Sequence, residues 1–294
     1  MKKNWQIVLA IVLGFVASRH AQADYGKDIE KWRAERETNL KKETGWLTVT
    51  GLFWLKEGTN TVGAGDKFDV RLTDNFKGGK FGQIDFGNGK AVLKVESGVD
   101  AQSDGNKIAG PVDLVSDEKG KPTQIVTGTQ TFFLIKREER YGIRLKDRNS
   151  EARRNFTGLH WFPIDESYKV VARLEPGTDL KELKVPNVLG GFFKEKSPGR
   201  LKFNLKGQEY SLQTVEEDDG SLFLIFGDQS NEKETYKSGR FLYADKLVNG
   251  ETVLDFNKAE NPPCAFTPYA TCPLPPAGNK LAVKIDAGEK RYDH

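Results

Sequence analysis

Histidine, cysteine and methionine are scarce in this sequence of 294 residues, which has three histidines, two cysteines and one methionine. Of the histidines, only His160 and His294 follow the first 23 residues, too few for a histidine-rich metal centre. We therefore predict no metal site and no cofactor. The sequence also lacks a G-x-S-x-G nucleophile motif and the alternating helices of an α/β hydrolase. His160 is accordingly interpreted as a structural residue.

The first 23 residues have the pattern of an export signal. Lys2 and Lys3 precede a mostly apolar stretch, residues 5–17, that is shorter than a membrane span. Residues 21–23, Ala-Gln-Ala, fit a cleavage site. The alternative is a retained membrane anchor. We expect cleavage after Ala23 and a periplasmic or secreted protein without stable membrane insertion.

An excess of positive charge is also missing from the expected mature chain. Cleavage removes three of the 45 basic residues and none of the 42 acidic residues, which leaves 42 of each sign. A nucleic-acid-binding protein needs a positive field to attract phosphates. We therefore predict no nucleic-acid partner.

Residues 24–45 are the one segment that predicts a helix. Ile29, Trp32 and Leu40 recur with helical spacing, and Gly45 is a natural stop. Such a helix either binds a partner or packs on the β unit that follows, and we expect the second.

The rest of the chain has the period of two that is typical of β strands. Asn88-Gly89 predicts a hairpin within residues 81–96. A second hairpin is expected within 129–147, with its turn near Tyr141-Gly142. Residues 97–123 are polar and predict short strands at most.

Seven further strands are expected between residues 167 and 257, and we expect 239–245 to pair with 254–257. The polar run 147–155 is the expected boundary between two consecutive β units. The prediction is an all-β, mainly antiparallel protein with one N-terminal helix. Residues 46–150 form a sandwich-like unit, and residues 156–294 form a meander that packs as a sandwich or closes into a barrel.

Several stretches resemble the DUF1684 family. They are RYGIRLKD (140–147), FTGLHWFP (156–163), ETYKSGRFLY (234–243) and LDFNKAENPPCAFTPYATCPLPPAGNKL (254–281), together with 45–63 and 287–290. The resemblance covers nearly all of the expected mature chain. This family has no assigned function, so the resemblance implies marked positions but no reaction. The family pattern has an aromatic residue before Asn261, where this sequence has Glu260.

Both cysteines, Cys264 and Cys272, lie in the segment 261–276, which also contains six of the twelve prolines. Their C-x7-C spacing does not suit zinc, and an exported chain with two cysteines normally pairs them. We predict a disulfide rather than free or catalytic thiols, worth about 2.5 kcal/mol by loop closure. The segment is expected to form an extended strap. Its expected buried contacts are Phe266, Tyr269 and Leu274.

Polar side chains near this strap are candidate ligand-binding residues. Asp255 and Asn257 are two residues apart, so a strand would place them on one face, where Arg240 could join them. Glu234 and Tyr236 come from the preceding turn. The alternatives are a buried structural network and a plain solvated face.

Arg144 and Asp147 resemble marked positions of the family and are also candidate ligand-binding residues. They suggest a paired arginine–carboxylate clamp, either between the two β units or with the carboxylate of a substrate. The hypothesis for function is an exported protein that binds a small ligand at a polar face of its C-terminal unit. The alternatives are a hydrolase with Asp255 and Glu234 as acid and base, and a structural envelope protein.

Overall fold

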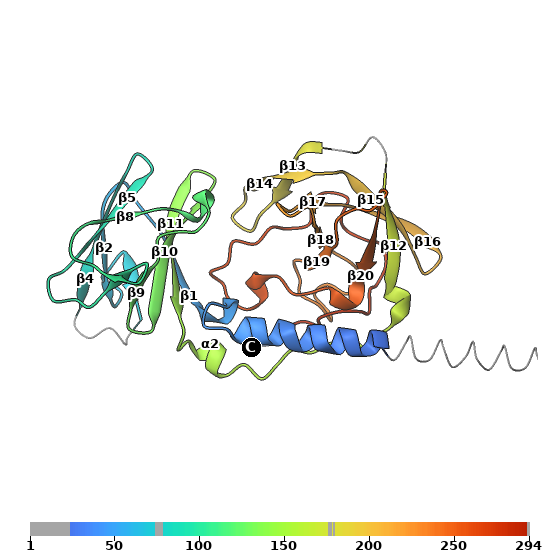
Figure 1. Cartoon of the computed structure of the whole chain (residues 1–294), viewed down its shortest axis with the longest axis horizontal. Coiled ribbons are helices and arrows are strands. Elements are labelled where there is room, and N and C mark those ends of the chain that lie inside the picture. Colours follow the sequence, from blue (N-terminus) through green and yellow to red (C-terminus); the bar gives the residue numbers. More distant parts are fainter. Residues whose placement is uncertain (1–23, 74–78, 176–177, 179, 293–294) are drawn as a thin grey trace, which may run out of the picture. The chain divides into compact units, whose positions relative to one another are not determined.

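The chain is divided into two compact units, each described separately below. The structure, a computed structural model, describes residues 24–73, 79–175, 178 and 180–292. Among them, unit 1 contains 24–39, 158–265 and 272–292, and unit 2 contains the rest, including 266–271. Both units consist mostly of antiparallel strands (Figure 1), which confirms the predicted fold class. The predicted export signal lies outside the described residues.

Unit 2 contains two β sheets. Its elements are η1 (Trp46–Thr48), β1 (Val49–Trp54), β2 (Gly58–Ala64), β3 (Val70–Leu72), β4 (Lys80–Gly87), β5 (Lys90–Val95), β6 (Gln102–Ser103), β7 (Asn106–Lys107), β8 (Val112–Leu114), η2 (Asp117–Lys119), β9 (Ile125–Thr127), β10 (Gln130–Arg137), β11 (Arg140–Asp147) and α2 (Glu151–Arg154). The strand orders are β1-β11-β10-β9-β6-β7 and β3-β2-β4-β5-β8.

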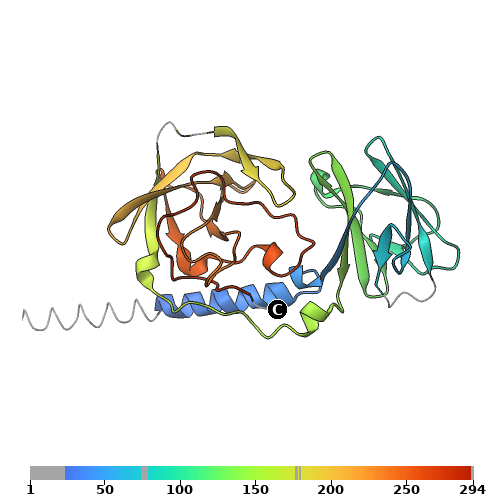
Figure 2. The ribbon, with the colours of Figure 1, turned by 180° about the vertical axis from the view of Figure 1, so that it is seen from behind.

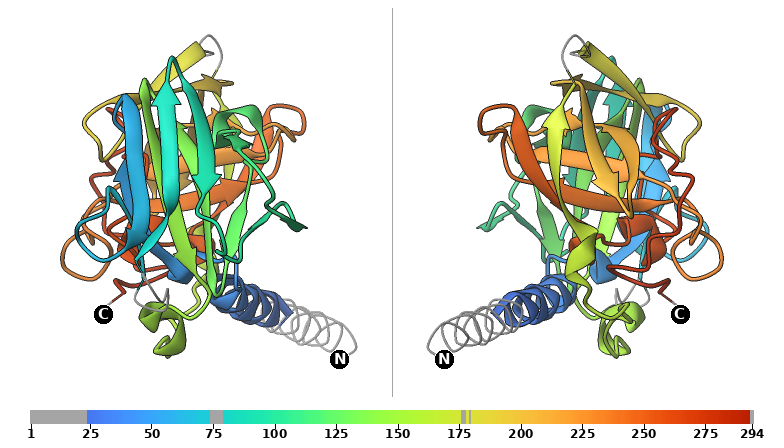
Figure 3. Two further views of the ribbon diagram at one scale, coloured as in Figure 1. Left: turned by 90° about the vertical axis from the view of Figure 1, so that its left-hand side faces the viewer. Right: turned by 90° about the vertical axis from the view of Figure 1, so that its right-hand side faces the viewer.

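The two sheets of unit 2 pack face to face as a sandwich (Figure 3, left). Phe81 and Ile84 of β4 and Phe132 and Ile143 of β10 and β11 belong to one buried cluster. Alternate residues of β10 point inward, because successive strand side chains project to opposite faces. The outer face of the six-stranded sheet therefore carries Arg144 and its cross-strand neighbours.

Both hairpins predicted for unit 2 are present, but the turn of the second was misplaced. The turn Asn88-Gly89 has the left-handed backbone that this sequence favours, with φ of 50° and 71°. The β10–β11 turn lies at 138–139, with Glu138 at φ 54°. Gly142 is instead inside β11, where an added Cβ would lie 2.9 Å from the Trp54 ring. This glycine makes room for a neighbouring strand and does not form a turn. Residues 97–123 form only short strands, as expected.

Unit 1 contains three smaller sheets. Its elements after the helix are η3 (Glu166–Tyr168), β12 (Lys169–Leu174), β13 (Leu180–Pro186), β14 (Phe192–Ser197), β15 (Arg200–Leu205), β16 (Gln208–Gln213), β17 (Val215–Glu216), β18 (Leu222–Phe226), β19 (Arg240–Ala244), β20 (Glu251–Asp255), η4 (Phe256–Lys258) and η5 (Pro263–Ala265). The strand orders are β16-β15-β12-β20, β17-β18-β19 and β13-β14.

The core of unit 1 joins the sheet that contains β12 to the sheet that contains β18 (Figure 3, right). Phe203, Phe226 and Phe256 contribute the large rings of this core. The expected pairing of β19 with β20 is wrong, because β19 pairs with β18 and β20 pairs with β12. Residues 245–250 thus carry the chain from one sheet to another instead of forming a tight hairpin.

A helix covers the described residues 24–41, as the sequence predicts, and its residues 24–39 belong to unit 1. It lies along the C-terminal segments of unit 1 (Figure 2). Ile29 is fully buried, and the rings of Trp32 and Trp161 meet edge to face at 5.6 Å. The Arg33 guanidinium donates to the Phe162 carbonyl at 2.8 Å. The apolar stripe of the helix is thus covered by residues distant in sequence.

Candidate functional site

Arg240, the central residue of the sequence-based hypothesis, is buried at the start of β19. Its side chain is 0% exposed, and its Nη2 donates to Asp228 Oδ2 at 2.6 Å. The same guanidinium donates to the carbonyls of Ala287 and Ile285 at 2.5 and 3.0 Å. The carboxylate that pairs with Arg240 is therefore that of Asp228 and not that of Asp255. Because the buried Asp228 carboxylate already neutralises this guanidinium, we infer that Arg240 braces the fold.

Asp255 and Asn257 do meet, as expected, but within a buried network. Asp255 ends β20, and Asn257 lies in the short helix η4 that follows. The Tyr25 hydroxyl donates to the two oxygens of Asp255 at 2.9 and 3.0 Å. Asn257 Nδ2 donates to Tyr25 Oη at 2.9 Å and to Asp255 Oδ1 at 3.1 Å. Burial and the Asp255 carboxylate raise the pKa of Tyr25. This network fastens the start of the described helix to η4.

Glu234 and Tyr236 interact with other residues than those of this network. Glu234 forms an ion pair with Lys284 at 2.5 Å. The Tyr236 hydroxyl donates to the Cys264 carbonyl at 3.2 Å. No hydrogen bond or ion pair joins either side chain to Asp255 among the described residues, so the two carboxylates proposed as an acid–base pair each serve a separate contact.

Asp147 and Arg144 are both buried in β11 but do not form a clamp with each other. Three residues apart on one strand, they project to opposite faces of the sheet. Asp147 accepts from the Thr73 hydroxyl at 3.1 Å and from the Asn149 amide at 2.8 Å. Asp147 thereby orders the turn after β11.

Arg144 is 4% exposed and has no carboxylate partner among the described residues. Its Nη2 donates to Thr271 Oγ1 at 3.3 Å, and its Nε is buried without a hydrogen-bond partner. A guanidinium has five N–H donors, so most of the hydrogen-bonding capacity of Arg144 is unused by the described residues. Burial, and then the nearby Arg137, lower the pKa of Arg144 to about 10. Arg144 is therefore still charged at neutral pH.

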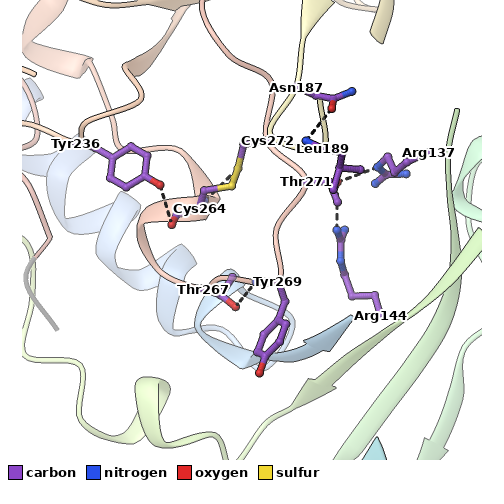
Figure 4. Close-up of a disulfide and its surroundings, with 10 residues drawn as sticks. All are labelled: Arg137, Arg144, Asn187, Leu189, Tyr236, Cys264, Thr267, Tyr269, Thr271 and Cys272. Atoms are coloured by element: carbon purple, nitrogen blue, oxygen red, sulfur yellow. Dashed lines mark hydrogen bonds between the residues drawn. A yellow bond between two sulfur atoms is a disulfide. The ribbon is translucent and has the colours of Figure 1, made fainter. Parts of the chain in front are cut away.

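Thr271 lies between two arginines of unit 2 (Figure 4). Its Oγ1 accepts from Arg137 Nε at 2.9 Å as well as from Arg144. Arg137 differs from Arg144 because it also pairs with Asp117 at 2.8 Å. The Thr271 hydroxyl hydrogen has no acceptor among the residues that the structure describes. A guanidinium and a hydroxyl donor are thus available side by side.

The loop that carries Thr271 is closed by the predicted disulfide, which is confirmed. Cys264 and Cys272 are joined, with their Cα atoms 6.2 Å apart (Figure 4). Between them, Thr267 donates to the Val49 carbonyl of β1 at 3.0 Å. The loop 266–271 therefore crosses β1, β11 and β10 of unit 2. Phe266 is buried as expected, whereas Leu274 is only half-buried and Tyr269 is 38% exposed.

Sequence reasoning missed an ionic cluster in unit 1 that contains Arg36, Glu260 and Glu289. Arg36 Nε lies 2.7 Å from Glu289 Oε1 and 3.3 Å from Glu260 Oε2. Glu289 also accepts from the Asn261 amide at 2.8 Å. Burial, and then the Glu289 carboxylate, raise the pKa of Glu260 to about 7, against the opposing effect of Arg36. The available signal was Glu260 itself, a carboxylate where the resemblance implies an aromatic residue.

A surface groove of about 690 Å³ lies over β12, β15 and β16 of unit 1. Its charged residues neutralise one another, since Lys202 lies 3.1 Å from Glu175 and 3.6 Å from Glu209. The described residues contain no cluster suited to a metal ion, and none of their helices is long and apolar enough to cross a membrane. Arg144, which is buried and has no ion-pair partner in the part of the chain that the structure describes, is therefore the strongest candidate for ligand binding.

Comparison with family models matches residues 154–290 to the family described as "Protein of unknown function (DUF1684)". Residues 154–290 of the chain belong to the DUF1684 family. The match includes the strap and the Arg36-binding carboxylates, but it does not extend to 45–63 or 140–147. The family model therefore adds no support for Arg144, although Thr271 lies within it.

One similar solved structure is the solution NMR structure of an uncharacterized protein of Haloarcula marismortui. Its sequence is 30% identical, and the alignment covers 47% of this chain and 78% of that chain with a TM-score of 0.39. Comparison with curated proteins gives no match.

Proposed function

We propose that this member of the DUF1684 family is an exported protein that binds a small anionic ligand through Arg144. The observation that carries the proposal is a buried guanidinium that pairs with no carboxylate of the described residues. The other two buried arginines, Arg33 and Arg240, each have one: Glu30 at 3.3 Å and Asp228 at 2.6 Å. An unpaired buried charge is costly unless something else neutralises it. An anionic ligand would supply that neutralisation.

The surroundings of Arg144 support an anion in two further ways. Arg144 and the Thr271 hydroxyl have hydrogen-bond donors that the described residues do not use, which favours a ligand with acceptor atoms. Planar guanidinium donors suit carboxylates. The disulfide-closed loop 266–271 supports preorganisation, because it places Thr271 before any ligand binds. This site is in unit 2, whereas the sequence-based hypothesis placed it at the polar face around Arg240.

Export is supported by the signal-like residues 1–23 and by the disulfide, since disulfides persist in oxidising compartments. Intact-mass measurement of the protein from the periplasm or medium is expected to show a chain that begins at Asp24. A retained Met1 would contradict cleavage.

Calorimetric titration of the oxidised protein with acetate and with inorganic phosphate tests the anion site. Binding of either anion to the wild-type chain is expected, with at least a tenfold loss in Arg144→Met. Asp147→Asn, on the opposite face of β11, is the matched control and is expected to bind normally. Equal affinity in wild type and Arg144→Met, or no anion binding in a wider carboxylate series, would reject the proposal.

The carboxylate hydrolase has no comparable support, because Asp255 and Glu234 are engaged in different contacts. A structural envelope protein is the interpretation that remains if no anion binds.

A further inference from the structure

The residues beside Arg144 are apolar, and this limits the kind of anion that fits. In the register of the six-stranded sheet, Arg144 of β11 pairs with Leu52 of β1 on one side and Phe133 of β10 on the other. Directly opposed residues share a face, with their Cβ atoms about 5 Å apart. Leu52, Arg144 and Phe133 thus form one row across the outer face.

Aromatic surface also lies against the guanidinium itself. The Cζ atom of Arg144 is 5.4 Å from the centroid of the Trp46 ring. Trp46, Leu52 and Phe133 are all only partly buried, so each retains apolar surface that a ligand can cover. A ligand that reaches Arg144 therefore meets hydrocarbon on several sides of the charge.

Two further cations lie near Arg144, and they differ in their partners. Arg137 is already paired with Asp117 at 2.8 Å. Lys146, on the same face, donates to the Thr44 carbonyl at 2.7 Å, and burial followed by repulsion from Arg144 lowers its pKa. The guanidinium of Arg144 stands in an apolar row, and burial of extra charge against hydrocarbon is costly, so this row suits a carboxylate better than phosphate, which carries more charge and needs more donors.

We propose that the ligand class is an amphipathic monocarboxylate, with its carboxylate on Arg144 and its apolar part along Leu52 and Phe133. This inference rests on the proposed function, that is, on anion binding at Arg144. It adds that burial of hydrocarbon contributes to the affinity.

The test is calorimetric titration of the oxidised full chain with acetate, butyrate, hexanoate and octanoate, and with succinate and inorganic phosphate. Each added methylene that becomes buried is expected to tighten binding about three- to fourfold. Octanoate should then bind at least tenfold more tightly than butyrate, and phosphate and succinate should bind more weakly than hexanoate.

Two variants localise the apolar contribution. Phe133→Ala is expected to lose most of the dependence on chain length while it keeps its affinity for acetate, and Phe133→Leu is expected to restore part of the dependence. Val115→Ala, at an exposed apolar position of the same unit (42%), should behave like wild type.

The outcomes separate the two proposals. If affinities for all carboxylates are equal, or if phosphate binds most tightly, the ligand class is wrong but anion binding stands. If chain-length dependence persists in Arg144→Met, the hydrocarbon binds elsewhere and the ligand class is rejected for this site. If neither carboxylates nor phosphate bind to the wild-type chain, the proposed function itself fails.

Discussion

Arg240 in unit 1 and Arg144 in unit 2 are both buried in a β sheet, but their charges are balanced differently. Arg240 is held by Asp228 and by two backbone carbonyls. Arg144 has one hydrogen bond at 3.3 Å, to a neutral threonine. The first arrangement neutralises the charge of the guanidinium, although Arg240 Nε has no hydrogen-bond partner among the described residues. The second has no carboxylate among the described residues, so its charge and several donors are left for another molecule. Burial of an arginine alone therefore does not distinguish a brace from a binding site, and the identity of its partners does.

The largest expected effect comes from removing the carboxylate of Asp228, which neutralises Arg240. Asp228→Asn keeps the shape of the side chain but leaves Arg240 buried without a counter-charge. The free energy of unfolding is expected to fall by about 3–5 kcal/mol. Urea unfolding followed by circular dichroism measures this fall. Asp218→Asn, at an exposed position of the same unit, is the control, and a loss below about 1 kcal/mol in Asp228→Asn would contradict the brace.

The partners of these two arginines, Asp228 and Thr271, could not be predicted from the sequence, whereas some local features could. Local patterns were sufficient for the Asn88-Gly89 hairpin, because two residues determine that turn. The cysteine pair was also predictable, since both partners lie in one short segment. Asp228 was missed as the partner of Arg240, because its loop carries no periodic signal. The contact of Arg144 with Thr271 spans 127 residues, and only the folded chain reveals it.

Side chains that alternate on a strand were predicted well, but the pairing of strands was not. The hydrogen bond between Asp255 and Asn257 was expected from their spacing and is present. It forms because Asn257 lies in the short helix η4, not because both residues lie on one face of a strand. The pairing of β19 with β20 was wrong, because neighbours in sequence were assumed to be neighbours in a sheet. Packing of the helix on unit 1 was missed for the same reason.

The second-largest effect is a pH dependence of stability at the Arg36 cluster. Here one arginine pairs with two carboxylates, those of Glu260 and Glu289, so the charges are not balanced one to one. The folded-state pKa of Glu260, about 7, lies above its usual 4.5, so the folded protein binds a proton more tightly than the unfolded chain. Stability is therefore expected to fall as pH rises from about 4.5 to about 7, by about 2–3 kcal/mol. Above pH 7 this loss is complete.

Glu260→Gln tests this pH dependence, because glutamine keeps the shape but cannot ionise. Melting temperatures between pH 4.5 and 8 are expected to converge at low pH, and the variant should be the more stable protein above pH 7. Glu232→Gln is a control at a carboxylate that has no ion pair among the described residues. Parallel melting curves for wild type and Glu260→Gln at all pH values would remove Glu260 as the titrating group.

A smaller effect is expected from the disulfide that closes the loop over unit 2. Replacement of Cys264 and Cys272 by serine removes a restraint worth about 2.5 kcal/mol at most, and the prolines already restrict the unfolded chain. We expect a loss of about 1–2 kcal/mol in stability together with weaker anion binding, because Thr271 is adjacent to Cys272. A reductant should weaken binding in the wild-type chain and leave the double variant unchanged. Normal binding by the double variant would show that the loop positions Thr271 without the disulfide.

The smallest effect is a stabilisation, expected for Arg144→Met without ligand. The substitution removes a buried charge whose pKa burial has lowered to about 10, and this gain is partly offset by lost packing on Trp46. The net result is expected to be a stabilisation of about 1 kcal/mol, whereas Arg240→Met should destabilise. Arg144→Lys keeps a charge without the planar donors, so it should lose anion binding without gaining stability. If Arg144→Met instead unfolds as easily as Arg240→Met, the two arginines have the same structural role, and the binding site at Arg144 must be withdrawn.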